Sequence, residues 1–193
     1  KGIHQKNIQL LAGKPLIAHS IETGLKSKFI DRVVVSTDDD QIAKVSRNYG
    51  AHVIKRPQKL AGDEIAEVLA WRHAIEAMPE YFSSDKNLFV SLPATSPLRA
   101  IKDIDNAIIT FESERPDLIL AISPSHRNPY LNMVECNEDG SIRVVLDGKG
   151  AFRRQDVPDV YNITTLIYVS TAKYITGCDG ILDGKIGYIK VPY

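Results

Sequence analysis

The sequence has little cysteine, no excess of either charge and no long apolar run. Two cysteines, Cys136 and Cys178, occur in 193 residues, and they form neither a metal-ligand motif nor a disulfide scaffold. Lys plus Arg and Asp plus Glu number 24 each, so no overall field draws the chain to nucleic acid or to an anionic membrane. No apolar segment reaches the roughly 20 residues of a membrane helix. We therefore expect a cytoplasmic protein with reduced thiols, no nucleic-acid or membrane partner, and only local anion sites.

The first two thirds of the sequence alternate between helical and strand patterns. Helices are expected from about Pro15 to Lys28, after Asp38 or Asp39 up to Gly50, from Asp63 to just before Pro79, and from Asp103 onward; strands are expected over 32–37, 51–54, 88–92 and 118–122. Continuous apolar runs of this kind are typical of strands covered on both faces. The alternation predicts an α/β fold with a mostly parallel sheet flanked by helices.

The pattern changes after Ser123. Two short apolar segments, 131–136 and 141–146, flank a turn at 137–140 that ends in glycine, which indicates an antiparallel hairpin. We expect this hairpin to lie in an excursion from the sheet over about 125–158. Further strands are expected over 163–169 and 186–191, with a short helix over 171–175 between them.

Polar segments that follow predicted strands are the first places to search for a site, because open α/β sheets bind ligands beyond the carboxyl ends of their strands. The basic segment 1–7, ahead of the first helix, is another candidate. Its lysines and glycine either contact phosphate oxygens or form a solvated terminus. Arg56, biased to extended backbone by Pro57, either presents its guanidinium to a base or phosphate or lies on the surface.

Two further segments leave similar alternatives open. The loop 92–99 carries two hydroxyls between prolines, so it either binds a ligand with little loss of entropy or caps the helix that follows. Adjacent Arg153 and Arg154 either hold a carboxylate with paired hydrogen bonds or solvate a loop. His73 lies within a helical pattern and is interpreted as a packed residue rather than a base. The sequence contains no nucleophile elbow, histidine-rich metal motif or Walker loop.

Several segments occur in a fixed order along the chain: Lys1-Gly2-Ile3 with Lys6-Asn7, Leu11 to Ile17, Asp31 to Asp38, Arg56-Pro57, Thr95-Ser96-Pro97-Leu98-Arg99, Arg154-Gln155 and Tyr168. Taken together, they resemble the acylneuraminate cytidylyltransferases, also called CMP-sialic acid synthetases. The resemblance implies a Rossmann-like nucleotidyltransferase fold in a homodimer, with the excursion over 125–158 used in dimerisation. It also implies transfer of CMP from CTP to the anomeric hydroxyl of a sialic-acid-like nine-carbon 2-keto sugar acid, with release of pyrophosphate and with Mg²⁺ as cofactor.

The same resemblance implies roles for ten residues. Lys6 and Arg154 match catalytic positions; Lys1, Asn7, Arg56 and Glu67 match nucleotide-binding positions; Pro93, Thr95, Ser96 and Arg153 match sugar-binding positions. Metal ligands are not expected within this chain. Displacement at the α-phosphorus of CTP needs alignment and cationic stabilisation of the departing pyrophosphate more than it needs acid-base chemistry.

Departures from the family pattern concern the sugar. Pro93 stands where the sialic acid enzymes commonly have Gln, and Ile65 and Glu67 replace their usual serines. Because pocket contacts set such preferences, legionaminic, pseudaminic and octulosonic acid derivatives are candidates beside sialic acid.

Departures at the two ends concern domain organisation. Family members have a strand and an Ala-Arg-X-Gly-Ser loop ahead of the lysine that matches Lys1, and an Asp-Ile-Asp metal segment after the last strand. We expect residues 1–193 to form a single cytidylyltransferase domain without these segments. Two alternatives remain: a 3-deoxy-octulosonate cytidylyltransferase, whose Gly-Asp-Glu-Pro motif is replaced in this sequence by 94–97, and a catalytically silent nucleotide- or sugar-binding module.

Overall fold

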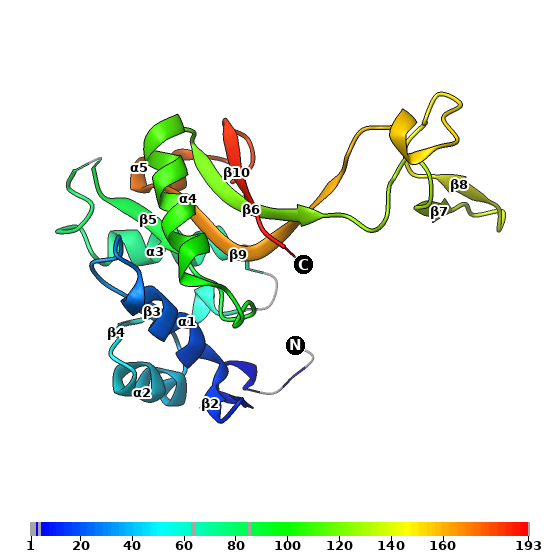
Figure 1. Cartoon of the computed structure of the whole chain (residues 1–193). Helices are drawn as coiled ribbons and strands as arrows, with labels where there is room; N and C mark the ends of the chain where they lie inside the picture. The colour runs from blue at the N-terminus through cyan, green and yellow to red at the C-terminus, as the bar shows by residue number, and fades with distance from the viewer. Residues whose placement is uncertain (1–2, 4, 63–64, 85, 193) are drawn as a thin grey trace. The chain divides into compact units, whose positions relative to one another are not determined.

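The computed structural model of the chain describes residues 3, 5–62, 65–84 and 86–192, so Lys1 and Asp63 lie outside the described residues. The chain divides into two units (Figure 1). We call residues 1–121 and 164–189 the core unit, and residues 122–163 and 190–193 the hairpin unit.

Helices and strands alternate along the core unit, which confirms the predicted α/β class. The helices are α1 (Leu16–Lys26), α2 (Asp40–Asn48), α3 (Glu67–Glu76), α4 (Ile101–Glu114) and α5 (Ala172–Gly177), and the 3-10 helices are η1 (Lys6–Ile8), η2 (Gln58–Leu60) and η3 (Arg154–Asp156). The strands are β1 (Leu10–Leu11), β2 (Lys14–Pro15), β3 (Val34–Thr37), β4 (His52–Lys55), β5 (Leu88–Ser91), β6 (Leu118–Pro124), β7 (Val134–Cys136), β8 (Ile142–Val144), β9 (Tyr161–Thr171) and β10 (Ile186–Lys190).

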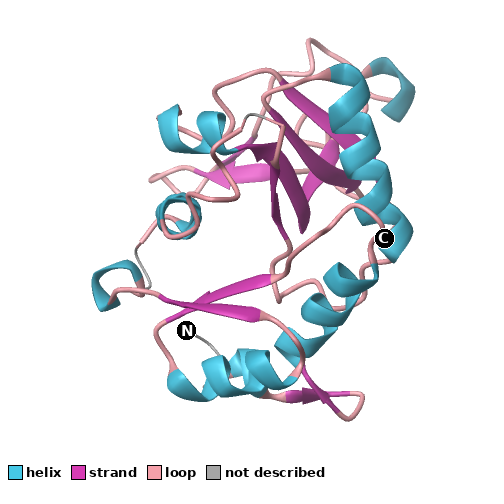
Figure 2. Cartoon of the chain, turned by 90° about the vertical axis from the view of Figure 1, so that its left-hand side faces the viewer, coloured by secondary structure: helices cyan, strands magenta, loops and turns pink. Residues whose placement is uncertain are grey.

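The main strands belong to a four-stranded sheet and a separate parallel pair. The larger sheet has the order β10-β6-β9-β5, and β5 runs antiparallel to β9 with Leu88 opposite Thr171. The pair β3–β4 is parallel, with Val34 opposite His52, and Figure 2 shows it apart from the larger sheet. Within the described residues, β3 and β5 are therefore each paired along one edge only.

Helices α3 and α4 bury apolar side chains at helical spacing. On α4 these are Ile104, Ala107, Ile108 and Phe111. On α3, the Trp71 ring packs against strand residues of the larger sheet, with centroids 5.6 Å from Phe89 of β5 and 5.2 Å from Tyr168 of β9. A smaller cluster of Ile17, Ile21 and Ala51 joins α1 to the β3–β4 pair.

Two predicted helix starts differ from the structure. Helix α4 begins at Ile101 with Ala100 as N-cap, so Asp103 lies in the first turn, where its charge still complements the helix dipole. Helix α3 begins at Glu67 after a turn in which the Ile65 N–H donates to Gly62 O at 3.3 Å, and it is shorter than the predicted segment. The α2 prediction is confirmed, because the Asp39 carboxylate accepts hydrogen bonds from the first turn.

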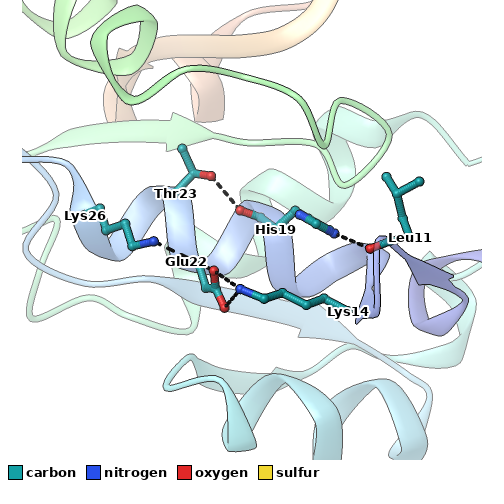
Figure 3. A network of polar contacts seen from close by, with 6 residues as sticks. All are labelled: Leu11, Lys14, His19, Glu22, Thr23 and Lys26. Atoms are coloured by element: carbon teal, nitrogen blue, oxygen red, sulfur yellow. Dashed lines mark hydrogen bonds and ion pairs between the residues drawn. The ribbon is translucent and has the colours of Figure 1, made fainter.

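A network of polar contacts fastens the β1–β2 hairpin to α1 (Figure 3). Lys14 Nζ donates to both carboxylate oxygens of Glu22, at 2.7 and 2.8 Å, and Lys26 Nζ lies 3.8 Å from the same carboxylate. The His19 ring contacts the carbonyl oxygen of Leu11 at 2.9 Å. Since η1 immediately precedes this hairpin, the network also limits where Lys6 can lie.

The hairpin unit contains the predicted β7–β8 hairpin. Val134 pairs with Val144 and Cys136 with Ile142 in antiparallel register, and Gly140 in the turn has φ +83°. Cys136 and Cys178 are both free. Among the residues that the structure describes, no helix is long and apolar enough to cross a membrane.

Candidate functional site

A groove of about 630 Å³ in the core unit lies between the facing edges of β3 and β5. Apolar side chains of the two strands and of α3 line most of it, including Val34, Val90 and Trp71. Arg56 and Glu67 add charge to this lining. Arg56 follows β4 and Pro93 follows β5, so these two residues lie at the carboxyl ends of strands, where the sequence predicted ligand contacts. Asp31, Arg32 and Lys86 add further charge at the amino ends of β3 and β5.

Arg56 is held at the groove by its neighbours on β3. Its backbone N–H donates to Thr37 O at 2.9 Å, and its Nη2 donates to Ser36 O at 2.5 Å. The Arg56 Nε and the Ser36 Oγ are buried and have no hydrogen-bond partner among the described residues. A buried donor without an acceptor costs about 1–3 kcal/mol, so this arrangement of Arg56 lowers the stability of the fold.

Glu67, at the start of α3, places a carboxylate on the same groove. Burial raises the pKa of the Tyr168 hydroxyl, and the nearby Glu67 charge raises it further. Tyr168 also packs on Trp71. A carboxylate in this place can accept hydrogen bonds from hydroxyls but repels phosphate, so its chemistry suits a ribose or sugar hydroxyl.

Three of the four sugar-binding candidates, Pro93, Thr95 and Ser96, share one turn after β5. The Ser96 Oγ donates to Thr165 O of β9 at 3.0 Å, and the Thr95 Oγ1 lies 3.4 Å from the Thr165 hydroxyl. Pro93 lines the groove, so the turn joins the groove to the surface of β9. The structure thus brings Arg56, Glu67 and Pro93 to one groove, with Thr95 and Ser96 on the adjoining turn.

Near the N-terminus, Lys6 and Asn7 lie on η1. The Lys6 side chain is exposed, and neither residue belongs to the lining of the β3–β5 groove. The side chain of Gln5 donates to Gln41 of α2 at 3.1 Å, which connects this segment to α2. Lys1 lies outside the described residues, so its predicted role has no structural test.

Arg153 and Arg154 lie in the hairpin unit and have different partners. Arg153 already holds a carboxylate in a paired arrangement, with Nε and Nη2 at 2.9 and 3.0 Å from the oxygens of Asp156. Arg154 Nη2 donates to Ser125 O and His126 O, at 3.1 and 3.4 Å. It lines a second cavity, of about 350 Å³, within this unit. Arg154 therefore has a cavity beside it, whereas Arg153 would have to exchange Asp156 for a ligand.

Arg99 had no predicted role, and the structure shows it to be buried. Its residue is 6% exposed, and its Nη2 donates to the carbonyl oxygen of Pro93 at 2.6 Å. Burial lowers the pKa of the Arg99 guanidinium to about 10, so the group stays charged at neutral pH. Arginine is mostly exposed in proteins, and no local pattern marked this one as internal.

Metal ligands were not expected within this chain. Among the described residues, no three His, Cys, Asp or Glu side chains form a cluster suited to a metal ion. His73, interpreted as a packed residue, lies on α3 outside the groove lining.

Comparison with known proteins connects this groove to a chemistry. A family model described as Cytidylyltransferase matches residues 1–176. The chain is 35% identical to the CMP-N,N'-diacetyllegionaminic acid synthase of Campylobacter jejuni over 189 residues, which cover 97% of this chain and 79% of that protein. It is 31% identical to the N-acylneuraminate cytidylyltransferase of Escherichia coli over 128 residues, 66% of this chain and 29% of that longer protein.

The fold has a solved counterpart. A structure of CMP:2-keto-3-deoxy-manno-octonic acid synthetase complexed with CTP superposes with a TM-score of 0.72 at 13% identity, covering 99% of this chain and 85% of that one. This similarity concerns the fold alone. The matched family model and the identity to named sugar-acid relatives show that the chain belongs to the cytidylyltransferase family of nucleotidyltransferases.

Proposed function

We propose that the protein transfers CMP from CTP to the anomeric hydroxyl of a sialic-acid-like 2-keto sugar acid and releases pyrophosphate. The observation that carries the proposal is the meeting of Arg56, Glu67 and Pro93 at one groove at the strand ends. The family match supports the reaction type. Arg56, which lines the groove, supplies guanidinium donors for the nucleotide, and the turn after β5 supplies hydroxyls for the sugar.

The proposed roles follow from charge and exposure. Lys6, exposed on η1, and Arg154, beside its cavity, would stabilise negative charge on the phosphates or on the sugar carboxylate. Asn7 would donate to a ribose or phosphate oxygen. The proposal also includes Mg²⁺ as the family's cofactor, with ligands from outside this chain. The roles proposed for Lys6, Asn7 and Arg154 do not include binding the metal.

A legionaminic-type acid is the favoured acceptor sugar. Legionaminic acid lacks the C9 hydroxyl of sialic acid and ends in a methyl group. Pro93 offers the groove an apolar ring and no side-chain donor, which suits a methyl group better than a hydroxyl. The relative named for a diacetyllegionaminic acid aligns over 97% of this chain.

The proposal also includes a homodimer in the cytoplasm, where CTP is supplied. The hairpin unit exposes a set of apolar side chains that another copy could cover. They are Met133, Val134, Ile142, Val144, Leu146 and Phe152.

The test is pyrophosphate release by the full-length natural protein with CTP, Mg²⁺ and each of the legionaminic, sialic, pseudaminic and 3-deoxy-octulosonic acids. We expect release with legionaminic acid at the highest kcat/KM, and little with the octulosonic acid. Release with the octulosonic acid alone would assign the protein to that branch. Binding of CTP in calorimetry without release in any mixture would contradict the transferase proposal and favour a silent binding module.

A further inference from the structure

The carbonyl oxygen of Pro93 accepts three hydrogen bonds. It accepts hydrogen bonds from Arg99 Nη2 at 2.6 Å, from Ser20 Oγ at 3.4 Å and from the Ser96 N–H at 3.3 Å. The last of these closes the turn from Pro93 to Ser96. The orientation of the Pro93 carbonyl group therefore determines the position of the turn from Pro93 to Ser96.

Arg99 ties that carbonyl to two other elements of the core unit. Its Nη1 donates to the Ser20 Oγ of α1 at 2.7 Å, and its Nε donates to Leu166 O of β9 at 2.9 Å. Ser20 in turn donates to Pro93 O, so the guanidinium, the hydroxyl and the carbonyl form a closed ring of hydrogen bonds. One rigid planar group thus holds α1, β9 and the turn in a fixed relation.

The acceptors of Arg99 are all uncharged. Within the described residues, no carboxylate forms an ion pair with it. Keeping an arginine in so buried a place is costly when neutral groups alone compensate its charge. Ligand sites keep such costly arrangements where they fix the geometry of groups that contact substrate.

We propose that Arg99 is the positioning residue of the sugar site, acting through the Pro93 carbonyl to hold the turn that carries Thr95 and Ser96. The inference rests on the proposed function, since the sugar contacts of that turn are part of it. Arg99 itself is covered by protein and acts through the turn. A lysine in its place would keep the charge but could not serve three acceptors in different directions with one planar fork.

Arg99→Lys is the main variant, and Arg72→Lys is its matched control. Arg72 also uses its guanidinium to bind backbone carbonyls, donating to Ile175 O at 2.8 Å and to Cys178 O, and it ties α3 to α5 away from the turn. Both substitutions remove a guanidinium group that donates to backbone carbonyls of another segment, so both should lower thermal stability. Only Arg99→Lys should disturb the turn after β5.

We expect Arg99→Lys to raise the KM for the sugar acid about tenfold or more while the KM for CTP changes less than about twofold. Ser20→Ala, which removes one member of the ring and keeps the guanidinium, should shift the sugar KM in the same direction by a smaller factor. Arg72→Lys should leave both KM values unchanged. If Arg99→Lys does not fold, the KM for the sugar acid is measured in Ser20→Ala instead. A raised KM supports the positioning role, and an unchanged KM contradicts it.

Amide hydrogen exchange separates this inference from the proposed function. In folded Arg99→Lys, the Ser96 N–H, which donates to Pro93 O, should exchange about tenfold faster than in the natural protein, and in Arg72→Lys it should not. This readout needs no substrate, so it stands if the natural protein transfers CMP to none of the tested sugars. Unchanged Ser96 exchange together with an unchanged sugar KM in folded Arg99→Lys would overturn the positioning role.

Discussion

At the scale of single residues, Arg56 is the group on which nucleotide binding can be tested most directly. Its Nη2 is engaged by Ser36 O while its Nε is buried without a partner in the described part of the chain. If the Arg56 guanidinium, which lines the groove, donates to CTP, Arg56→Ala removes a charge-assisted hydrogen bond of about 1.5–3 kcal/mol. We expect the KM for CTP to rise about tenfold or more, as measured by pyrophosphate release at saturating sugar.

The control for this variant is Arg47→Ala. Arg47 is exposed in the last turn of α2, and its removal changes the net charge by the same amount. An equal rise in the KM for CTP in Arg56→Ala and Arg47→Ala would indicate a general electrostatic effect. A folded Arg56→Ala protein with the natural KM for CTP would remove Arg56 from the site.

Residue identity could select segments for the candidate site, but it could not predict which side chains are buried. The segments around Arg56 and Thr95 could be selected because prolines and polar side chains follow predicted strands. The burial of Arg99 could not, because it depends on acceptors from α1 and β9 that are 79 and 67 residues away in the sequence. The ion pair of Arg153 with Asp156 is local, three residues apart, and could have been anticipated from that spacing.

At the scale of elements, the β1–β2 hairpin depends on the ion pair between Lys14 and Glu22. The hydrogen bond from Lys14 lowers the pKa of Glu22 below its ordinary value of 4.5. A carboxyl group with a lowered folded pKa binds protons less readily when folded, so its stabilising effect is complete above the unfolded value. That effect is lost as the pH falls through the folded pKa.

We therefore expect Glu22→Gln to lower the free energy of unfolding at neutral pH and to have a shrinking effect as the pH falls below 4.5. Urea unfolding of both proteins across this pH range measures the difference. Lys14→Met should change the free energy of unfolding with the same pH dependence. Lys26→Met should have a smaller effect, because the natural Lys26 Nζ lies 3.8 Å from the carboxylate. A Glu22→Gln effect that is independent of pH would show that the pair contributes by packing alone.

Element order was largely predictable, and the sheet was less so. Apolar runs such as 88–92 predicted strands correctly because burial on both faces leaves a mark in the sequence. Strand pairing leaves no such mark, and the antiparallel alignment of β5 with β9 had to come from the structure.

At the scale of the whole molecule, the hairpin unit bears on assembly. Its two strands place Glu135 opposite Arg143, and these side chains form an ion pair at 2.8 Å. The neighbouring register positions pair Val134 with Val144, and because side chains alternate along a strand these lie on the other face. A two-stranded hairpin is marginal by itself in water, and an exposed apolar face marks a contact surface. The pattern supports the proposed homodimer.

Ile142→Lys tests this surface with little disturbance of the fold, because Ile142 is 64% exposed. Dimer interfaces bury about 1,200–2,000 Å² and tolerate an unpaired charge at their centre poorly. We expect the natural protein to sediment as two copies and Ile142→Lys to dissociate toward one. Ile109→Lys on α4, where Ile109 is 50% exposed in the core unit, should keep the natural sedimentation. A dimer that survives Ile142→Lys, or one that Ile109→Lys dissociates equally, would place the interface away from the hairpin.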